Sequence, residues 1–183
     1  MKASFKMALA AILVAVGVVI APFFYIPFVT TKAYPGQHMV NTIAGVLLGP
    51  WWAAGIAIVI GLIRMSLGVG TIYSMPGGVP GGLVVGLVAW AIRKTGFKRV
   101  EFAALAEPIG TALIGGTLAL YVVAPFIGDE RLAAIGLIPL WGLWAASSVT
   151  GSVLGFIILG VLQATGIYSF TENHAKVSLD QNS

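Results

Sequence analysis

Six apolar stretches follow one another along the chain, separated by polar segments and by segments rich in glycine and proline. A helix that crosses a bilayer needs about 20 mostly apolar residues, with a range of about 17–25. Four stretches reach that range, and two are shorter. We predict an all-α integral membrane protein with six transmembrane helices, at residues 7–24, 37–48, 51–67, 83–92, 102–126 and 137–166.

Three predicted loops, at residues 26–36, 68–82 and 127–135, lie at one end of this bundle, which we take as the outer end. The second loop is rich in glycine, but no GK[ST] sequence follows it, so a phosphate-binding loop is excluded. We expect a flexible gate or a tight connection there, with the next helix beginning at Leu83 or as early as Ser74. Short membrane segments beside such breaks often mark the binding site of a transporter.

The composition supports the membrane assignment. Hydrophobic residues make up 58% of the chain and charged residues 9%, whereas soluble domains carry about 25% charged residues. The basic and apolar N-terminus could be a signal peptide. We expect a retained first helix instead, because the run is long and no polar domain follows it. Residues 1–170 are predicted to form one six-helix domain, and residues 171–183 a polar tail.

Basic residues predict the orientation. Placing both termini in the cytoplasm puts Lys32, Arg64 and Arg131 outside, and seven basic residues inside: Lys2, Lys6, Arg93, Lys94, Lys98, Arg99 and Lys176. This satisfies the positive-inside rule for a multi-pass protein of a prokaryotic cell membrane. The net charge is +4, but the basic residues are scattered along the chain, so the charge does not indicate nucleic-acid binding. Cysteine is absent and the two histidines are far apart, so we expect no metal site and no cofactor.

The most informative stretch surrounds the turn at Pro35 and Gly36, where five polar side chains occur within ten residues: Lys32, Tyr34, Gln37, His38 and Asn41. Polar groups in an apolar chain are costly unless they meet a partner or a ligand. Amide and imidazole groups suit a neutral heterocycle or alcohol better than a strongly charged ion. The alternative is hydrogen bonding that only holds helices together.

Two charged residues interrupt apolar runs. Glu107 is the only acid deep within one, with Thr111 one turn further along the same helix face. It could contact a ligand or make a structural hydrogen bond. Arg64 near the end of its helix could anchor a substrate, but we favour a cation that reaches the membrane interface.

Aromatic and small residues form two further patterns. Trp141, Trp144, Ser148 and Ser152 share one helix face, which would suit an aromatic ligand or an ordinary interfacial belt. Ala11 and Ala15 form a small-residue pair on the first helix, of the kind that lets another helix approach closely.

No enzyme or nucleotide-binding motif is present, so any ATP-driven step would need partner chains. A stand-alone facilitator or channel and an intramembrane enzyme are the other two classes. The first would conduct after reconstitution alone, and the second would need a nucleophile and base that the sequence does not order.

Three segments carry a resemblance to a known family: KAYPGQHMVNTIAGVLLGPWW at 32–52, RMSLGVGTIYSMPGG at 64–78 and AEPIGTALIGG at 106–116. The chain resembles the ThiW family, whose members look like substrate-binding S components of energy-coupling factor (ECF) vitamin transporters. The resemblance covers about residues 7–166, and the first segment is the most specific.

The resemblance implies that the chain binds a thiamin precursor, with hydroxyethylthiazole as the first candidate and thiamin or hydroxymethylpyrimidine as alternatives. It implies partners: a transmembrane coupling subunit that docks on Ala11 and Ala15, and two ATPase subunits. The substrate would occupy an outward-facing pocket beneath the first two outer loops. The candidate pocket residues are Tyr34, Gln37, His38, Asn41, Thr71, Tyr73, Glu107, Thr111, Trp141 and Trp144.

Overall fold

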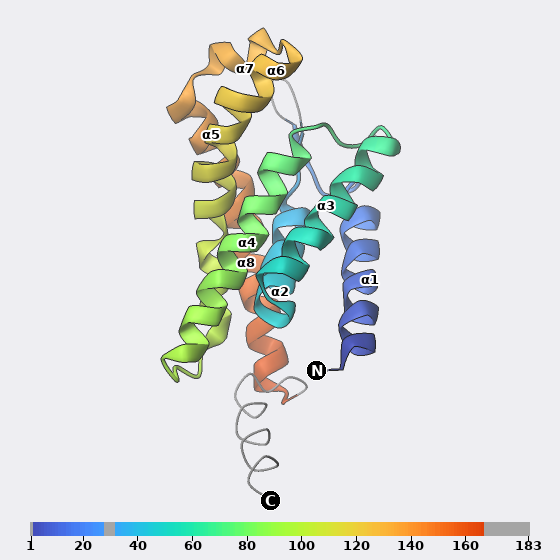
Figure 1. The fold of residues 1–183 in the computed structure, drawn as a ribbon, viewed down its shortest axis with the longest axis vertical. Helices are drawn as coiled ribbons and strands as arrows, with labels where there is room; N and C mark the ends of the chain where they lie inside the picture. The colour runs from blue at the N-terminus through green and yellow to red at the C-terminus, as the bar shows by residue number, and fades with distance from the viewer. Residues whose placement is uncertain (1, 28–31, 167–183) are drawn as a thin grey trace, which may run out of the picture.

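The structure is a computed structural model that describes residues 2–27 and 32–166 as a bundle of helices with one short β-hairpin (Figure 1). The predicted tail at 171–183 lies outside the described residues. In chain order the elements are α1 (Ala3–Ile20), β1 (Ile26–Pro27), β2 (Lys32–Ala33), α2 (Pro35–Leu48), α3 (Pro50–Ser66), α4 (Ser74–Lys94), η1 (Val100–Ala106), η2 (Ile109–Gly115), α5 (Gly116–Leu118), η3 (Ala119–Val123), α6 (Ala124–Ile127), α7 (Glu130–Ile135) and α8 (Leu137–Ala164).

Helix α2 lies at the centre of the bundle. It packs against α1, α3, α4, η1 and α8, and every one of its residues except Met39 is buried. A helix that is apolar on nearly all sides is stable only when other elements surround it. This explains why α2 has only 14 residues: protein rather than lipid covers it, so its length is not set by the bilayer.

Four segments among the described residues are long and apolar enough to cross a membrane: Ala3–Ile20, Ser74–Lys94, Val100–Ile127 and Leu137–Ala164. Helix α3 is apolar but slightly shorter, and α2 is shorter still. The all-helical membrane fold is thus confirmed, while six complete crossings stay a prediction. Figure 1 shows the start of α1 and the end of α8 at the same end of the bundle. The cytoplasmic placement of that end also stays a prediction.

Helix α4 begins at Ser74, at the earliest start that the sequence allowed, so the predicted loop over 68–82 is wrong from that residue onward. The first residues of a helix have no carbonyl partner for their N–H groups, so Pro76 is tolerated near its start. Glycine is a poor helix former, but α4 packs against α2, α3, η1 and η2 along its length. Packing therefore overrides the local preference of the glycines.

The fifth predicted helix is continuous in space but irregular in its hydrogen bonding. It begins as the 3-10 helix η1 and passes after Pro108 into the π-helical segments η2 and η3. Proline removes one helix donor, and π-helical turns occur often at functional sites. A second buried acid, Glu101, lies in η1 and pairs with Arg99. Glu107 is therefore not the only acid buried in this segment.

The outer loops contain more regular structure than the sequence suggests. The first contains the β1–β2 hairpin, in which Ile26 pairs with Ala33, and α2 begins at Pro35, which favours the first turn of a helix. The third, predicted as a loop over 127–135, includes the helix α7. Asp129 caps α7 by accepting a hydrogen bond from the backbone N–H of Leu132 at 3.0 Å, a capping signal that the sequence analysis missed.

Candidate functional site

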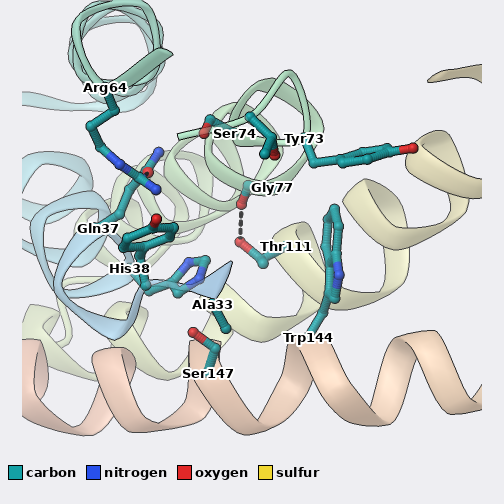
Figure 2. A pocket seen from close by; sticks show the side chains of 12 residues that line it. Ala33, Gln37, His38, Arg64, Tyr73, Ser74, Gly77, Thr111, Trp144 and Ser147 are labelled. Carbon is teal, nitrogen blue, oxygen red and sulfur yellow. Dashed lines mark hydrogen bonds between the residues drawn. The ribbon is translucent and has the colours of Figure 1, made fainter. Parts of the chain in front are cut away.

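A cavity of about 60 Å³ lies where α2, α3, α4, η2 and α8 meet below the outer loops. One water needs about 10–15 Å³ of such space, so the cavity can receive more than a single water. Figure 2 shows its side chains converging from helices far apart in the sequence. The lining residues are Ala33, Tyr34, Gln37, His38, Arg64, Thr71, Tyr73, Ser74, Gly77, Thr111, Trp144 and Ser147.

The structure brings most of the predicted pocket residues to this cavity. Those that line it are Tyr34, Gln37, His38, Thr71, Tyr73, Thr111 and Trp144. Glu107 and Asn41 are fully buried and do not line it; instead they make hydrogen bonds with each other and with residues of the wall. Trp141 does not line the cavity, because its indole nitrogen donates to Thr117 Oγ1 at 3.2 Å. Contact of any of these residues with a ligand stays a prediction.

Glu107 contacts three side chains of two elements, α2 and η2, through one carboxylate oxygen. Its Oε1 lies 2.9 Å from Nδ1 of His38, 3.2 Å from Nδ2 of Asn41 and 2.6 Å from Oγ1 of Thr111. A carboxylate only accepts hydrogen bonds, so the imidazole donates from Nδ1. This orientation leaves Nε2 of His38 as the nitrogen available to a ligand. Glu107 thus makes structural hydrogen bonds and orients a side chain of the cavity, while its contact with a ligand stays a prediction.

Two glycines of α4 leave room for these polar groups. A Cβ atom on Gly81 would lie 2.3 Å from Oε1 of Glu107 and 2.4 Å from Oγ1 of Thr111. A Cβ atom on Gly78 would lie 2.3 Å from Nε2 of Gln37. The backbone of α4 also takes part, because the Gly78 carbonyl accepts from Asn41 at 3.0 Å. The glycine-rich sequence is therefore part of the wall of the site rather than a loose gate.

Arg64 lines the cavity and is 1% exposed, so its interpretation as an interfacial cation is wrong. Its Nη1 donates to Oε1 of Gln37, and its guanidinium carbon lies 3.5 Å from the ring centroid of Tyr34. The Tyr34 hydroxyl in turn donates to the Val69 carbonyl. The chain after α3 folds back over Arg64, whose carbonyl accepts from the amides of Val69 and Gly70 at 3.0 Å. This turn places Arg64 under a loop instead of at the lipid surface.

Helix α8 contributes Trp144 and, three residues on, Ser147. Trp144 is 8% exposed, and Figure 2 shows its ring on the opposite side of the cavity from Arg64. Ser147 was missed, since the predicted face continued to Ser148, although a spacing of three also keeps residues on one side of a helix. The Ser147 hydroxyl is buried without a hydrogen-bond partner. Such an oxygen is available to a bound molecule.

The outer rim of the cavity is tied to α7. The Tyr73 hydroxyl donates to Oδ2 of Asp129 at 2.7 Å, and Asp129 also caps α7. The hydrogen bond from the Leu132 amide, followed by that from Tyr73, lowers the pKa of the Asp129 carboxyl. Burial and the contact with Asp129 raise the pKa of the Tyr73 hydroxyl, so it remains a donor at neutral pH.

Replacing Asp129 by alanine is expected to destabilise the protein by about 1 kcal/mol at pH 7, because the α7 cap is lost. The lowered pKa means that the capping contribution is complete above the ordinary carboxyl value of about 3.9 and disappears as the pH falls through the folded value. Thermal unfolding in detergent between pH 3 and 7 measures this. Asp129→Asn is the control, since asparagine caps equally well but does not titrate. An unchanged deficit of the alanine variant at pH 3 would contradict the assignment.

No group of three or more His, Cys, Asp or Glu side chains that could hold a metal ion occurs within residues 2–27 and 32–166. The residues that line the cavity offer hydrogen-bonding groups, one buried guanidinium and aromatic rings. These groups recognise and enclose a small molecule.

Comparison with known families decides the class of protein. The family described as "Thiamine-precursor transporter protein (ThiW)" matches residues 7–165. The chain belongs to the ThiW family. The match covers the apolar helices and every residue that lines the cavity. Comparisons with curated proteins and with solved structures gave no match.

Membership of the ThiW family makes this chain a thiamine-precursor transporter protein of the membrane, and it indicates transport rather than catalysis. A transporter of a thiamine precursor acts on a small-molecule substrate.

Ala11 and Ala15, the predicted docking pair of this ThiW chain, are both exposed on α1. Ala11 also lines an open hollow of about 390 Å³ between α1 and α3, beside Trp51 and Trp52. The pair is thus accessible to another helix, and its role as a docking surface stays a prediction.

Proposed function

We propose that this ThiW-family chain is the substrate-binding S component of an ECF importer and that it binds a thiazole precursor of thiamin, with hydroxyethylthiazole as the reference ligand. The observation that carries the proposal is the cavity itself. Its buried polar side chains come from α2, α3, η2 and α8: Gln37, His38, Arg64, Thr111 and Ser147. Polar groups placed so deeply are costly unless they meet a partner or a ligand, and the Ser147 hydroxyl has no partner in the protein.

The cavity offers complementary groups for such a ligand. Nε2 of His38 can accept from a hydroxyl, or donate to a ring nitrogen when the imidazole is protonated. The free hydroxyl of Ser147 is a second polar partner. The rings of Tyr34 and Trp144 can cover the faces of a heterocycle and exclude water. A small aromatic ring with one or two polar substituents makes use of every one of these groups.

Transport in this proposal depends on partner chains. The sequence has no nucleotide-binding motif, so two ATPase subunits would supply the energy, and a transmembrane coupling subunit would connect them to the S component. The exposed small side chains of Ala11 and Ala15 support docking on α1, because small residues let helix backbones approach closely. The loaded S component would then topple in the membrane to release its substrate inside.

Other substrates and another transport mode give different results. If thiamin or hydroxymethylpyrimidine is the substrate, it will bind more tightly than hydroxyethylthiazole. A stand-alone facilitator would carry the substrate into liposomes without any partner. Co-purification with a coupling subunit, and ATP-dependent uptake only in its presence, would support the S-component proposal.

Replacing His38 by alanine is expected to weaken binding of hydroxyethylthiazole at least about tenfold, because a buried hydrogen bond to the ligand is lost. Calorimetry and tryptophan fluorescence of the purified protein measure the affinity for hydroxyethylthiazole, thiamin and hydroxymethylpyrimidine. His38→Asn separates binding from folding, since its amide can replace Nδ1 beside Glu107 while the Nε2 edge is removed. Thr150→Ala, on the exposed face of α8, is the control.

Saturable binding of the thiazole, weakened in both His38 variants and unchanged in Thr150→Ala, would support substrate and site together. Failure of all three ligands to bind the folded wild-type protein would overturn the thiamin-precursor assignment. Equal binding by wild type and both His38 variants would move the site away from this cavity.

A further inference from the structure

Arg64 places a positive charge in the wall of the cavity. It lies in the last turn of α3, and its side chain is 1% exposed. Arginine remains protonated in proteins, and moving its charge out of water is costly unless other groups offset that cost. The groups that surround this guanidinium therefore indicate which kind of ligand the cavity binds.

The partners of Arg64 within the protein are neutral. Nη1 donates to the amide oxygen of Gln37, and the face of the guanidinium lies against the ring of Tyr34. Its Nε is buried and has no hydrogen-bond partner. No carboxylate forms an ion pair with it within residues 2–27 and 32–166. One amide and one aromatic ring thus stabilise the charge of Arg64 in part, and its Nε donor has no acceptor.

The buried or partly buried acids are occupied elsewhere. Glu107 stands behind the cavity wall and accepts from three side chains at a single oxygen. Glu101 pairs with Arg99, and Asp129 binds Tyr73 and caps α7. Arg64 is consequently the only permanently charged side chain among the residues that line the cavity. A ligand that enters meets a positive wall near Gln37 and a neutral, aromatic wall near Trp144, as Figure 2 shows.

We propose that Arg64 binds an anionic group on the substrate, a carboxylate or a phosphate monoester carried by the thiazole ring. This rests on the proposed function and narrows its substrate class. The guanidinium presents its donors in a planar fork that matches the oxygens of a carboxylate or phosphate. An oxyanion at this position would pair the buried charge and supply an acceptor for the free Nε.

The same arrangement selects against a cation. Thiamin carries a permanent positive charge, and like charges in a water-poor cavity repel each other strongly. The acid that could compensate this charge, Glu107, is already engaged and lies behind the wall. Thiamin is therefore the least favourable of the candidate substrates, and an acidic thiazole is the most favourable.

The test compares three thiazoles on purified wild-type protein by calorimetry: hydroxyethylthiazole, the analogue in which a carboxylate replaces its CH2OH end, and the phosphate monoester of the alcohol. At least one anion is expected to bind about tenfold or more tightly than the alcohol, a difference of about 1.4 kcal/mol. The two anions together identify which oxyanion fits the cavity. Equal or tighter binding of the neutral alcohol would overturn this inference and leave the proposed function intact.

Arg64→Met is the decisive variant, because an apolar side chain of similar length replaces the buried charge without leaving an unpaired opposite charge behind. It is expected to reduce the preference for the anion to about twofold or less while the alcohol still binds. Arg64→Lys is expected to keep part of the preference, since it retains the charge but loses the planar fork. A preference that survives unchanged in Arg64→Met would also overturn the inference.

A second measurement does not depend on thiazole recognition. Acetate and inorganic phosphate, compared with chloride at equal ionic strength, are expected to raise the unfolding temperature of wild type but not of Arg64→Met. If no thiazole binds but these anions stabilise only wild type, the anion-binding role of Arg64 is supported and the proposed function is wrong. If no thiazole binds and the anions do not stabilise wild type, the inference and the proposed function are both wrong.

Discussion

Glu107→Ala is expected to destabilise the protein by about 3–5 kcal/mol, the largest loss among the side chains of the site. The carboxylate is fully buried and accepts hydrogen bonds from His38, Asn41 and Thr111. Removing this shared acceptor leaves several buried donors without their partner, and each unsatisfied buried donor costs about 1–3 kcal/mol. Here it would leave the imidazole without its acceptor and open a gap between α2 and η2.

Unfolding of the purified protein in detergent, followed by circular dichroism, measures the loss. Glu107→Gln is the matched variant, because its amide keeps the shape and one acceptor oxygen while it removes the negative charge. We expect it to retain most of the stability. Glu130→Ala, at an exposed acid of α7, controls for the removal of a carboxylate elsewhere. A Glu107→Ala protein as stable as wild type would show that this carboxylate does not hold the site together.

Gly81→Ala is expected to abolish or strongly weaken substrate binding through a single added methyl group. Its Cβ would lie 2.3 Å from Oε1 of Glu107 and 2.4 Å from Oγ1 of Thr111, closer than any real contact of this kind. Either α4 must move away from η2 or the carboxylate must shift away from His38. Overpacking of this kind costs about 1–3 kcal/mol, and a shifted carboxylate no longer orients the imidazole.

The matched control is Gly55→Ala in α3, where an added Cβ meets nothing within 4 Å. Both substitutions add one methyl group to a helix and raise helix propensity equally. Binding of the thiazole and the unfolding temperature are measured for both variants. The expected result is normal binding in Gly55→Ala and at least about a tenfold loss in Gly81→Ala. Equal affinities would show that α4 can adjust without disturbing Glu107.

Much of the site could be predicted from sequence because its polar residues are few. Gln37, His38 and Thr111 stand out against an apolar background, and the cost of burying them limits their possible roles. The same reasoning failed for Arg64, since a cation near the end of a helix usually reaches water. The turn at Val69 and Gly70 folds over this residue, and its guanidinium contacts Gln37 and Tyr34 of a distant segment; neither feature leaves a periodic signal in the sequence.

The helix boundaries show a similar division. The apolar runs of α1 and α8 are long enough to be found from their length alone. The start of α4 is hidden by four glycines and two prolines between Ser74 and Gly82, which favour a loop by local preference. They are helical because α2 and η2 approach α4 closely. The sequence shows that a glycine lowers helix propensity, but it does not show which neighbouring element packs closely against that glycine.

The complete enclosure of α2 has a consequence for how the protein is made. This helix is short, and it contains Gln37, His38 and Asn41, so it is a poor candidate for stable insertion on its own. One of its sides is covered by α8, which is synthesised after every other element that packs on α2. The second helix therefore has its full set of neighbours only after α8 has been made. Until then its polar side chains have Glu107 but not α8 as a neighbour, so the cavity still lacks the wall that Trp144 and Ser147 form.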